Sequence, residues 1–346
     1  THFYIEDKLS GRPWVTKLHF PVHCIAKTET RDRISGYRFV SEYKYHHGYF
    51  DHAEKEFRGF GMVEQIDTED FELWQLTEAT NVVDDKVLHQ QPVLVKTWTH
   101  TGAFFENDKI LNQFAHEYWP EEMKRQGFTV TNPEHNLTAA RIIDEKGNDL
   151  VAGNGLSPHD WQEALRACKG MALRSETFAK DANTANPQGE ALQTILTPYS
   201  VATHNCIIER VQPKGQNRHA VFIVKESEAI TYNYEREIED PRITHTLNSK
   251  LDIYGNVLEA ASVVYPRKIK ITSLPLATQQ AQDETWITYT ENTFTNDIDV
   301  RLEPNKPDAL RLPLPSESKT WQLKGVKRKT APNLFYSLSD FTDILN

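Results

Sequence analysis

The stretch YHHGYFDHAEKEFRGFGMVE, residues 45–64, decides how the fold of this chain is interpreted. Leading into it, Tyr37–Tyr45 alternates aromatic and polar residues, which predicts a half-buried strand. The residues HHG at 46–48 predict a turn, and Phe57–Ile66 predicts the next extended segment. The stretch therefore indicates two consecutive strands of a sheet.

Glycine and aromatic residues mark the same stretch. Gly59 and Gly61 lie inside the second predicted strand, where glycine often indicates a bulge or a close backbone approach. Aromatic side chains are dense here, and two interpretations stay open: cross-strand packing, worth roughly 0.2–1 kcal/mol per pair, or binding of carbohydrate or a partner. The aromatic residues are Tyr43, Tyr45, Tyr49, Phe50, Phe57 and Phe60.

The rest of the chain is also predicted to be mainly β, with a few short helices. Apolar residues at helical spacing predict a helix over Glu106–Trp119. A second helix is expected from Ser157 to Leu173, with Ser157 as N-cap and Pro158 in the first turn. Further strands are predicted at Pro92–Thr99, Ile207–Gln212, Ala220–Lys225, Ala229–Tyr234, Ile243–Leu251, Val257–Tyr265, Glu284–Thr290 and Thr320–Lys324.

Glycine, asparagine and proline divide the chain. The Gly- and Asn-rich segment Asp144–Gly155 predicts the main boundary, between a region 1–150 and a region 151–346. Asp181–Gly189 and Glu303–Ser316 predict surface loops. Residues 251–258, LDIYGNVL, predict a hairpin because Asp, Asn and Gly accept turn geometry.

Composition excludes several classes of function. The 346 residues carry 49 Asp+Glu against 39 Lys+Arg, a net charge of −10, which argues against a nucleic-acid-binding surface. The longest uncharged run, Ala191–Ile208, contains Pro198 and His204, so it does not predict a membrane span. The N-terminal residues lack the apolar stretch of a signal peptide, and without a starting Met the chain is expected to be a piece of a longer protein.

Searches for catalytic and metal motifs give only weak candidates. The clusters His46, His47 and His52, and His19 with His23, lack a metal-binding spacing, so no metal is expected. No GxSxG, GxGxxG or P-loop sequence occurs, so neither a nucleophile nor a cofactor site is predicted.

Two further features carry little chemistry by themselves. The pairs Glu226/Glu228 and Glu235/Glu237 resemble the ExE of ADP-ribosyltransferases, but the STS strand that positions the dinucleotide is missing. The cysteines Cys24, Cys168 and Cys206 are odd in number and widely spaced, so free buried thiols are expected.

Residues 45–64 resemble the YHDGYYDxxEREFRGFGxVE stretch of the B components of bacterial Tc insecticidal toxin complexes, the SpvB-related TcB-type proteins of the Rhs/YD-repeat group. The resemblance continues in order, from near residue 30 to beyond 325, and the 251–258 unit looks like a divergent YD repeat. The sequence departs from the family at His47, Phe50, His52 and Cys168, where the family has Asp, Tyr, a small residue and an aliphatic residue. The motif residues are Tyr45, Gly48, Tyr49, Asp51, Glu56, Phe57, Arg58, Gly59, Phe60 and Gly61 in the first block; Arg166, Lys169, Gly170 and Arg174 in the second; Tyr234, Glu235, Arg236, Asp240, Pro241 and Arg242 in the third; and Asp252, Tyr254, Gly255 and Asn256 in the YD-like unit.

The resemblance implies a scaffold. In this family the B and C components form a hollow shell of antiparallel β-sheet around a cytotoxic segment of the C component, and the B component docks onto the pore-forming A component through another region. Region 1–150 would be the B component's middle region, and 151–346 would be Rhs/YD-type shell. The chain would be secreted, non-enzymatic, without cofactor, and would not enter the membrane itself. Two alternatives are an ADP-ribosylating SpvB-like effector fragment and a surface module that binds glycans through the aromatic block.

Overall fold

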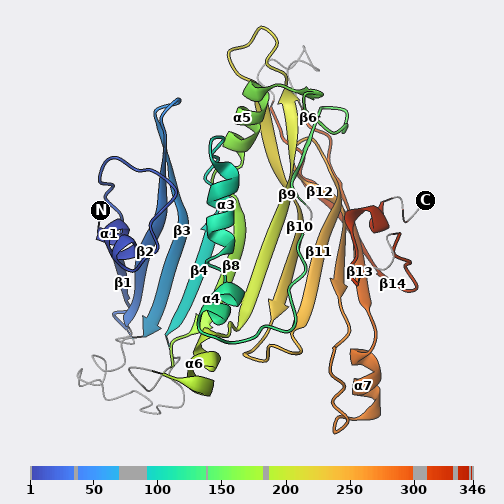
Figure 1. The fold of residues 1–346 in the computed structure, drawn as a ribbon. Coiled ribbons are helices and arrows are strands. Elements are labelled where there is room, and N and C mark those ends of the chain that lie inside the picture. Colours follow the sequence, from blue (N-terminus) through green and yellow to red (C-terminus); the bar gives the residue numbers. More distant parts are fainter. Residues whose placement is uncertain are drawn as a thin grey trace.

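The computed structural model describes residues 2–34, 38–69, 92–137, 139–181, 187–298, 310–329, 334–342 and 344. Within them, twelve strands form one sheet in the spatial order β1-β2-β3-β4-β8-β9-β10-β11-β12-β13-β14, with β5 paired to β9 (Figure 1). All neighbours along this path are antiparallel, and β5 is parallel to β9. The strands are β1 (Lys27–Arg31), β2 (Arg38–Asp51), β3 (Glu56–Glu69), β4 (Val93–Thr99), β5 (Arg141–Ile143), β8 (Ala172–Ala179), β9 (Ser200–Gln212), β10 (Val221–Asn233), β11 (Arg242–Leu251), β12 (Val257–Val264), β13 (Trp286–Phe294) and β14 (Pro315–Leu323).

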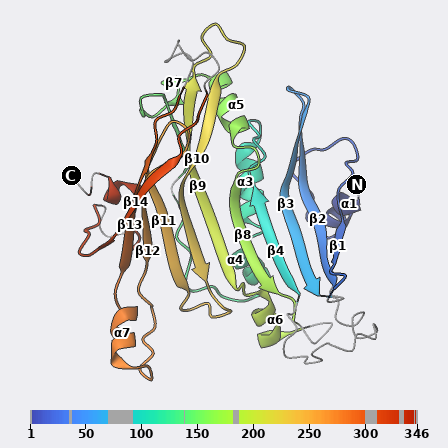
Figure 2. The same cartoon turned by 180° about the vertical axis from the view of Figure 1, so that it is seen from behind.

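Short helices lie on one face of this sheet or at its ends. Figure 1 shows α3 and α4 in front of the central strands and α5 beside the end of β9, and Figure 2 shows the opposite face with the strands in front. A small separate sheet pairs β6 (Val151–Ala152) with β7 (Gly155–Leu156). The helices are α1 (His2–Leu9), α3 (Asn107–Ala115), α4 (Trp119–Arg125), α5 (Pro158–Ala167), α6 (Gly189–Leu196), α7 (Leu276–Gln282) and the 3₁₀ turn η2 (Leu338–Phe341).

The mainly β prediction is confirmed, and most predicted strands are found at the expected places. Two predicted strands, Ala220–Lys225 and Ala229–Tyr234, are halves of the single strand β10, which bends at a bulge near Ser227 rather than turning. Strand β9 begins at Ser200, seven residues before the predicted start. Tyr37, at the start of the first predicted strand, lies outside the described residues.

The predicted turn at residues 46–48 is wrong. His46 and His47 continue strand β2, and the chain reverses only after Asp51, at residues 52–55. His47 has a positive φ of 57°, so the local irregularity is a kink inside the strand. The sequence HHG therefore marks a distortion of the ladder rather than its end.

Both predicted helices exist but are shorter than expected. Of the helix predicted over Glu106–Trp119, only Asn107–Ala115 is helical, as α3, and α4 begins at Trp119 and runs beyond the predicted end. The backbone N–H of Trp119 donates to the carboxylate of Glu176 at 3.1 Å instead of continuing the ladder of α3. Helix α5 begins as predicted, with the Ser157 hydroxyl accepting from the Asp160 N–H, but it ends at Ala167. Residues from Ala172 onward form β8.

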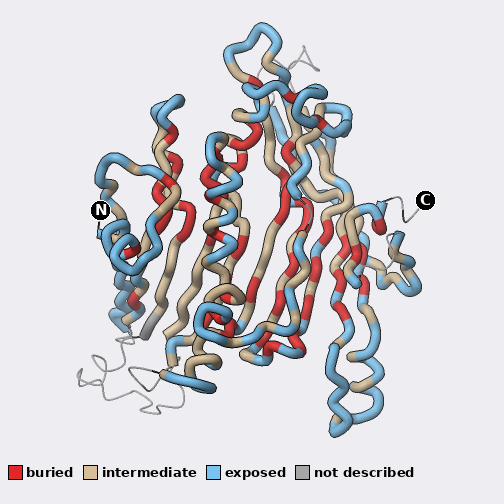
Figure 3. The backbone as a smooth tube through the Cα atoms, in the orientation of Figure 1, coloured by how far each residue is buried: buried red, intermediate tan, exposed pale blue. Residues whose placement is uncertain are grey.

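The core lies between the sheet and the elements on its helix-bearing face. Neighbouring side chains on this face run across eight strands in register: Trp98, Arg174, Thr203, Ile230, His245, Val263, Ile287 and Leu323. Trp98, Ile230 and His245 are fully buried. Residues 126–137 cross over the central strands, where the His135 N–H donates to the Tyr232 hydroxyl. Figure 3 shows buried positions alternating with partly exposed ones along these strands.

The predicted boundary segment 144–155 and the two predicted loops, 181–189 and 303–316, can be located in the structure only in part. Residues 144–155 carry β6 and β7, and the main sheet passes from β4 directly to β8, so the two sequence regions share one sheet. The division at residue 150 stays a prediction. Residues 182–186 and 303–309 of the two predicted loops lie outside the described residues, and Pro315 begins β14.

Candidate functional site

The turn between β2 and β3 is fixed by a buried ion pair inside the first motif block. The Arg58 guanidinium lies 2.8 Å from the Asp51 carboxylate, and both side chains are almost fully buried. Asp51 also accepts from the backbone N–H groups of Ala53 and Glu54, which closes the turn. Arg58 further donates to the Gly102 carbonyl, so the turn is anchored to the loop after β4. Breaking a buried pair of this kind typically costs about 3–5 kcal/mol.

The first and second motif blocks meet at the C-terminal end of α5. Glu56 accepts from Lys169 at 3.1 Å and lies 3.3 Å from the Arg166 guanidinium. Burial alone would raise the pKa of Glu56, but Lys169 and Arg166 outweigh it and hold this pKa below its usual value. Gly170, with φ +81°, lets the chain turn so that its N–H reaches the His100 carbonyl. The resemblance linked these blocks only by order in the sequence, and the fold joins them in space.

Gly59 and Gly61 are required for different reasons. Between the pairs Gly48↔Phe60 and Phe50↔Phe57 the register shifts, which leaves a bulge that contains Gly59 with φ +91°. The predicted bulge is therefore confirmed at Gly59. A Cβ on Gly61 would lie 2.4 Å from the ring of Phe114 in α3, so this position is a close approach. The sequence indicated a bulge or a close backbone approach at these glycines; the bulge is found at Gly59, whereas Gly61 is the close approach and lies outside the bulge.

The aromatic residues of the first block contact one another. The ring centroids of Tyr45 and Phe60 are 5.0 Å apart, and those of Phe57 and Phe60 are 5.6 Å apart. Tyr49 packs against the buried cluster around Trp98. These contacts support the packing interpretation of the aromatic block.

Arg174, the last residue of the second block, lies in a buried polar network beneath α4. It donates to Glu176 at 2.7 Å and to Glu134 at 2.6 Å, and its guanidinium stacks 4.5 Å from the Tyr118 ring. Glu134 also accepts from the Tyr234 hydroxyl, which joins the third block to the second. Desolvation raises the pKa of the fully buried Glu176, although the positive charge of Arg174 acts to lower it.

The third block forms the connection between β10 and β11. Glu235 and Arg236 both have positive φ, 48° and 67°, and the N–H groups of Tyr234 and Glu235 donate to the Tyr199 carbonyl. Arg236 forms a two-pronged pair with Asp181.

The end of the third block anchors a later strand connection. Asp240, beside Pro241, accepts from Arg267 at 2.8 Å and from the Lys268 N–H at 2.7 Å. Arg242 begins β11 and pairs with Glu235.

The YD-like unit is a hairpin, as predicted. It joins antiparallel β11 and β12, and Gly255 has φ +87°. The Asp252 carboxylate accepts from the N–H groups of Tyr254 and Asn256 at 2.9 and 2.8 Å. The buried Lys225 donates to the Asp252 carbonyl at 2.7 Å, which holds the hairpin against β10.

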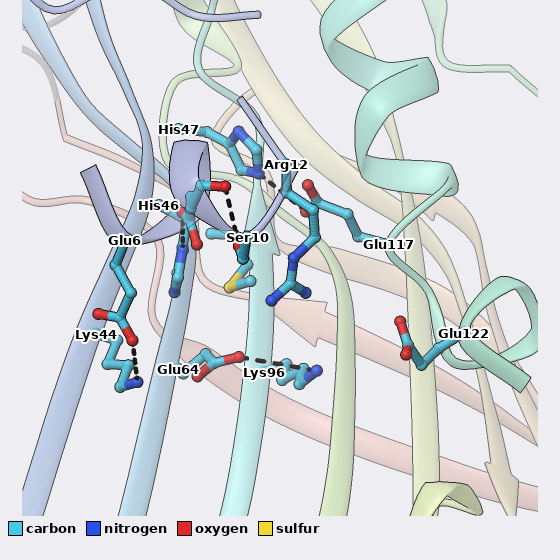
Figure 4. Close-up of a pocket in the computed structure, with 12 residues that line it drawn as sticks. Glu6, Ser10, Arg12, Lys44, His46, His47, Glu64, Lys96, Glu117 and Glu122 are labelled. Atoms are coloured by element: carbon cyan, nitrogen blue, oxygen red, sulfur yellow. Dashed lines mark hydrogen bonds and ion pairs between the residues drawn. The ribbon is translucent and has the colours of Figure 1, made fainter. Parts of the chain in front are cut away.

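A small cavity of about 120 Å³ beside α1, β2 and β3 is lined by His46 and His47, two of the histidines that the sequence presented as a possible metal cluster (Figure 4). His52 lies elsewhere, with its Nε2 2.7 Å from Nε2 of His19. His46 Nδ1 lies 2.6 Å from Asp7, and His47 Nε2 lies 2.9 Å from Glu117, so each ring is paired with a carboxylate from another element. Burial would raise the pKa of Asp7, but hydrogen bonds from His46 and Trp14 hold it below its usual value. The described residues contain no group of three or more side chains that could hold a metal ion.

Two rows of register neighbours mark the opposite face of the sheet, which we call the open face. One row of register neighbours crosses β4 to β12 and a second crosses β9 to β14, and neither contains Asp, Glu, Lys or Arg. Thr246 and Thr288 in the second row are exposed, and His204 in the same row pairs with the Glu226 carboxylate at 2.6 Å. The rows are Thr97, Ser175, Ala202, Thr231, Thr244, Val264 and His204, Ala229, Thr246, Ser262, Thr288, Gln322.

Sequence analysis did not identify several residues that form ion pairs or hydrogen bonds with the predicted site residues. Glu134, Glu117 and Asp181 belong to no motif block, and their partners lie 40 to 70 residues away along the chain. The sequence does contain a signal for the open face, because Thr recurs at period two in β11 and β13, but only the strand register shows which way these side chains face.

The chain matches two related sequence families. The insecticide toxin TcdB middle/N-terminal region matches residues 3–96, and the insecticide toxin TcdB middle/C-terminal region matches residues 163–303. Together these matches span more than half of the chain. A search of curated proteins found no match. Among the described residues, no helix has the length and apolar character needed to cross a membrane.

Solved structures of toxin complexes share the fold. The crystal structure of TcdB2-TccC3 is 25% identical, with a TM-score of 0.66 over 92% of this chain. A form of that complex without the hypervariable C-terminal region has 25% identity and a TM-score of 0.64, again over 92% of this chain. A Photorhabdus luminescens Tc holotoxin pore, 24% identical, matches in fold over 93% with a TM-score of 0.65. This chain spans only 14% of the length of each of these matched chains. The chain belongs to the middle region of the TcdB-type B components of insecticidal Tc toxins.

Proposed function

We propose that this chain is a non-enzymatic wall segment of the shell that the B and C components of a Tc toxin build around the toxic segment of the C component. The open face would line the enclosed cavity, and the helix-bearing face would lie outside. The complexes of TcdB2 with TccC3 support a C-component partner, and the holotoxin supports an A-component partner reached through other parts of the B component. A toxin of this kind acts after secretion.

The observation that carries the proposal is that neither row of the open face contains Asp, Glu, Lys or Arg, while one row member, His204, pairs with the Glu226 carboxylate. A loosely folded cargo must be confined without being bound, because a tightly bound chain would not leave. Charged wall residues would attract oppositely charged cargo segments, and a continuous apolar wall would bind exposed apolar side chains at about 25 cal/mol per Å². Thr, Ser and Ala, such as Thr231, Ser262 and Ala202, provide neither strong charge nor large apolar area.

The two edge strands fit a piece of a larger wall. Strand β1 (Lys27–Arg31) is exposed along its whole length, and β14 (Pro315–Leu323) is exposed over most of it. Edge strands present unpaired N–H and C=O groups and need cover or pairing to avoid aggregation. We infer that neighbouring shell strands pair with these edges in the complete toxin.

Accessibility of the open face tests the proposal. Thr246→Cys places a thiol on the open face, and Thr272→Cys places a matched control thiol in the exposed connection between β12 and α7. A maleimide attached to a polymer too large to enter the shell is applied to the B component alone and to the assembled B–C complex. We expect the Thr246→Cys thiol to react in the free B component and to be protected in the complex, while the Thr272→Cys thiol reacts in both.

Equal labelling of the Thr246→Cys thiol before and after assembly would contradict the proposed placement. The alternatives have separate tests. A glycan module would show saturable glycan binding lost in a Tyr49→Ala, Phe60→Ala variant, and an ADP-ribosylating fragment would cleave NAD. The mutual packing of Tyr45, Phe57 and Phe60 favours the wall over the glycan module.

A further inference from the structure

Two histidines from different segments of the chain turn their ring nitrogens toward each other. His19 lies in the segment before β1, and His52 lies in the turn between β2 and β3. Their Nε2 atoms are 2.7 Å apart whereas their ring centroids are 4.5 Å apart, so the two rings converge at Nε2. Both residues are exposed. Spacing along the chain grouped His19 with His23, and the fold instead pairs it with a histidine 33 positions away.

Backbone and aromatic contacts hold the two segments in this register. The Phe50 N–H donates to the Lys17 carbonyl at 3.0 Å. The two histidines each lie two positions further along the chain, so the same register brings them together. The Phe20 ring packs edge-on against Phe50, and Phe50 packs edge-on against His52, with centroids 5.2 and 5.1 Å apart. These contacts place the two imidazoles side by side independently of the pairing between their nitrogens.

The geometry of the pair is close to that of a metal ligand set. Imidazole nitrogens are common ligands of divalent transition metals such as Cu²⁺, Ni²⁺ and Zn²⁺. Two ring nitrogens that bind one Zn²⁺ at about 2.0–2.1 Å with a tetrahedral angle lie about 3.3 Å apart. The Nε2–Nε2 distance of 2.7 Å is shorter by about 0.6 Å, a difference that small rotations of two exposed rings remove.

The protons of the pair also permit metal binding. In a pair of neutral imidazoles, one Nε2–H donates to the other Nε2. When both Nε2 atoms bind a metal ion, each neutral ring carries its proton on Nδ1 instead, so the pair loses no proton.

We propose that His19 and His52 form a binding site for one divalent transition-metal ion, with water in the remaining coordination positions. The described residues contain no group of three suitable side chains, so the affinity should be modest and should be higher for Cu²⁺ than for Zn²⁺. Mg²⁺ should not bind, because it prefers oxygen ligands. Position 52 is one of the positions at which this sequence departs from the family pattern, so the site is a feature of this chain.

A bound ion would fasten the segment before β1 to the β2–β3 turn, which contains the buried pair of Asp51 and Arg58. In the unfolded chain the two histidines are separated by 33 positions, and bringing them together requires closing that loop. The folded state should therefore bind the ion more tightly than the unfolded state does. Consequently, Zn²⁺ should raise the unfolding temperature.

The site is tested first on the unsubstituted protein, so that this result does not depend on the folding of any variant. The protein is treated with a chelator, separated from it and titrated with Zn²⁺, while long-range ¹H–¹⁵N correlation spectra of the histidine rings are recorded. We expect the Nε2 signals of His19 and His52 to shift together and to saturate at one Zn²⁺ per chain, and Mg²⁺ to shift neither. Shifts of many histidines without saturation would show adventitious binding only and would overturn the proposal.

Variants separate one shared site from two independent ones. In calorimetric titrations, His19→Gln and His52→Gln should each weaken Cu²⁺ binding by about 10-fold or more, since loss of a group that only orients a metal ligand already costs roughly 10–100-fold. The double variant should bind little more weakly than either single variant, because the shared site is already lost. His23→Gln, at an exposed histidine four positions from His19, is the control and should bind Cu²⁺ as the unsubstituted protein does.

Thermal unfolding provides a second readout. Zn²⁺ should raise the unfolding temperature of the unsubstituted protein and of His23→Gln, and should leave that of His19→Gln and His52→Gln unchanged. Unchanged Cu²⁺ binding in His52→Gln, or losses that add up in the double variant, would show that the two rings do not share an ion and would overturn the assignment. An equal loss of binding in His23→Gln would also overturn it.

Discussion

Lys169 Nζ donates a hydrogen bond to Glu56 Oε1 at 3.1 Å, although the two residues are 113 positions apart. Glu56 begins β3, and Lys169 follows the last turn of α5, so this contact joins a hairpin near the edge of the sheet to a helix over its centre. The chain thus fixes the two most family-like segments of its sequence against each other.

This contact should be measurable as a coupling between the two positions. A double-mutant cycle with Glu56→Gln and Lys169→Met should give a coupling free energy of about 0.2–1 kcal/mol, because both side chains are partly exposed to solvent. Urea unfolding of the four proteins provides the measurement. The exposed pair Glu317 and Lys319 is the matched control and should show no measurable coupling. Equal coupling in the two pairs would refute a specific contact.

Substitutions of Gly59 and Gly61 should destabilise the protein by different mechanisms. Gly59→Val should cost about 1–3 kcal/mol because its φ of +91° is unfavourable for a residue with a Cβ. Gly61→Val should cost a similar amount, about 1–3 kcal/mol, through collision with Phe114.

The mechanisms can be separated with a third substitution. In a Phe114→Ala background, Gly61→Ala should become much less costly, while Gly59→Ala should keep its full cost. Thermal or urea unfolding measures both. If Phe114→Ala relieves both glycine substitutions equally, or neither, the two explanations are wrong.

Local signals predicted local structure well. The Ser157-Pro158 cap, the 251–258 hairpin and the bulge at Gly59 depend on residues within a few positions, and all three are found. The turn expected at residues 46–48 failed because the kink at His47 is held from outside, by Glu117 before α4. A local pattern does not contain that partner.

The arrangement in space of segments far apart in the chain could be predicted only in part from the sequence. The order of the motif blocks indicated one continuous β structure, but the Arg174–Glu134 pair and the contact of Glu56 with α5 depend on how the chain crosses the sheet. The same limit applies to the open face. Alternation predicts two faces for each strand, and only the register shows that Thr231 and Thr244 share one.

His100 should make stability depend on pH. Burial lowers the pKa of His100 from 6.5 to about 4, and its Nδ1 accepts from the Gly102 N–H. As pH falls from above 6.5 toward 4, the unfolded chain takes up a proton at this residue that the folded chain does not. The free energy of unfolding should therefore fall over this window, by roughly 3 kcal/mol at most.

A His100→Asn variant, which can still accept from Gly102, is the comparison. Its free energy of unfolding should change less between pH 7 and pH 4.5 than that of the unsubstituted protein, as measured by urea unfolding at each pH. Parallel pH profiles for the two proteins would show that His100 is not the group responsible.

The YD-like hairpin should depend on the Asp252 carboxylate. Asp252→Ala removes the acceptor for the N–H groups of Tyr254 and Asn256, which should cost about 1–2 kcal/mol. Tyr254→Phe removes the exposed hydroxyl contact to Asp297, keeps the backbone N–H that donates to Asp252, and serves as the control, with a smaller change expected. Hydrogen exchange at the Asn256 amide should accelerate in Asp252→Ala alone. Unchanged exchange in that variant would contradict the role of the carboxylate.

The direction of the open face in the assembled toxin is the central claim, and an electron cryomicroscopy map of the complete B–C complex tests it most directly. The account predicts that Thr231, Thr244 and Thr246 face an enclosed cavity, that α4 lies on the outer surface, and that strands of neighbouring segments pair with β1 and β14. A map in which α4 faces the cavity, or in which another domain packs directly on these threonines, would contradict it.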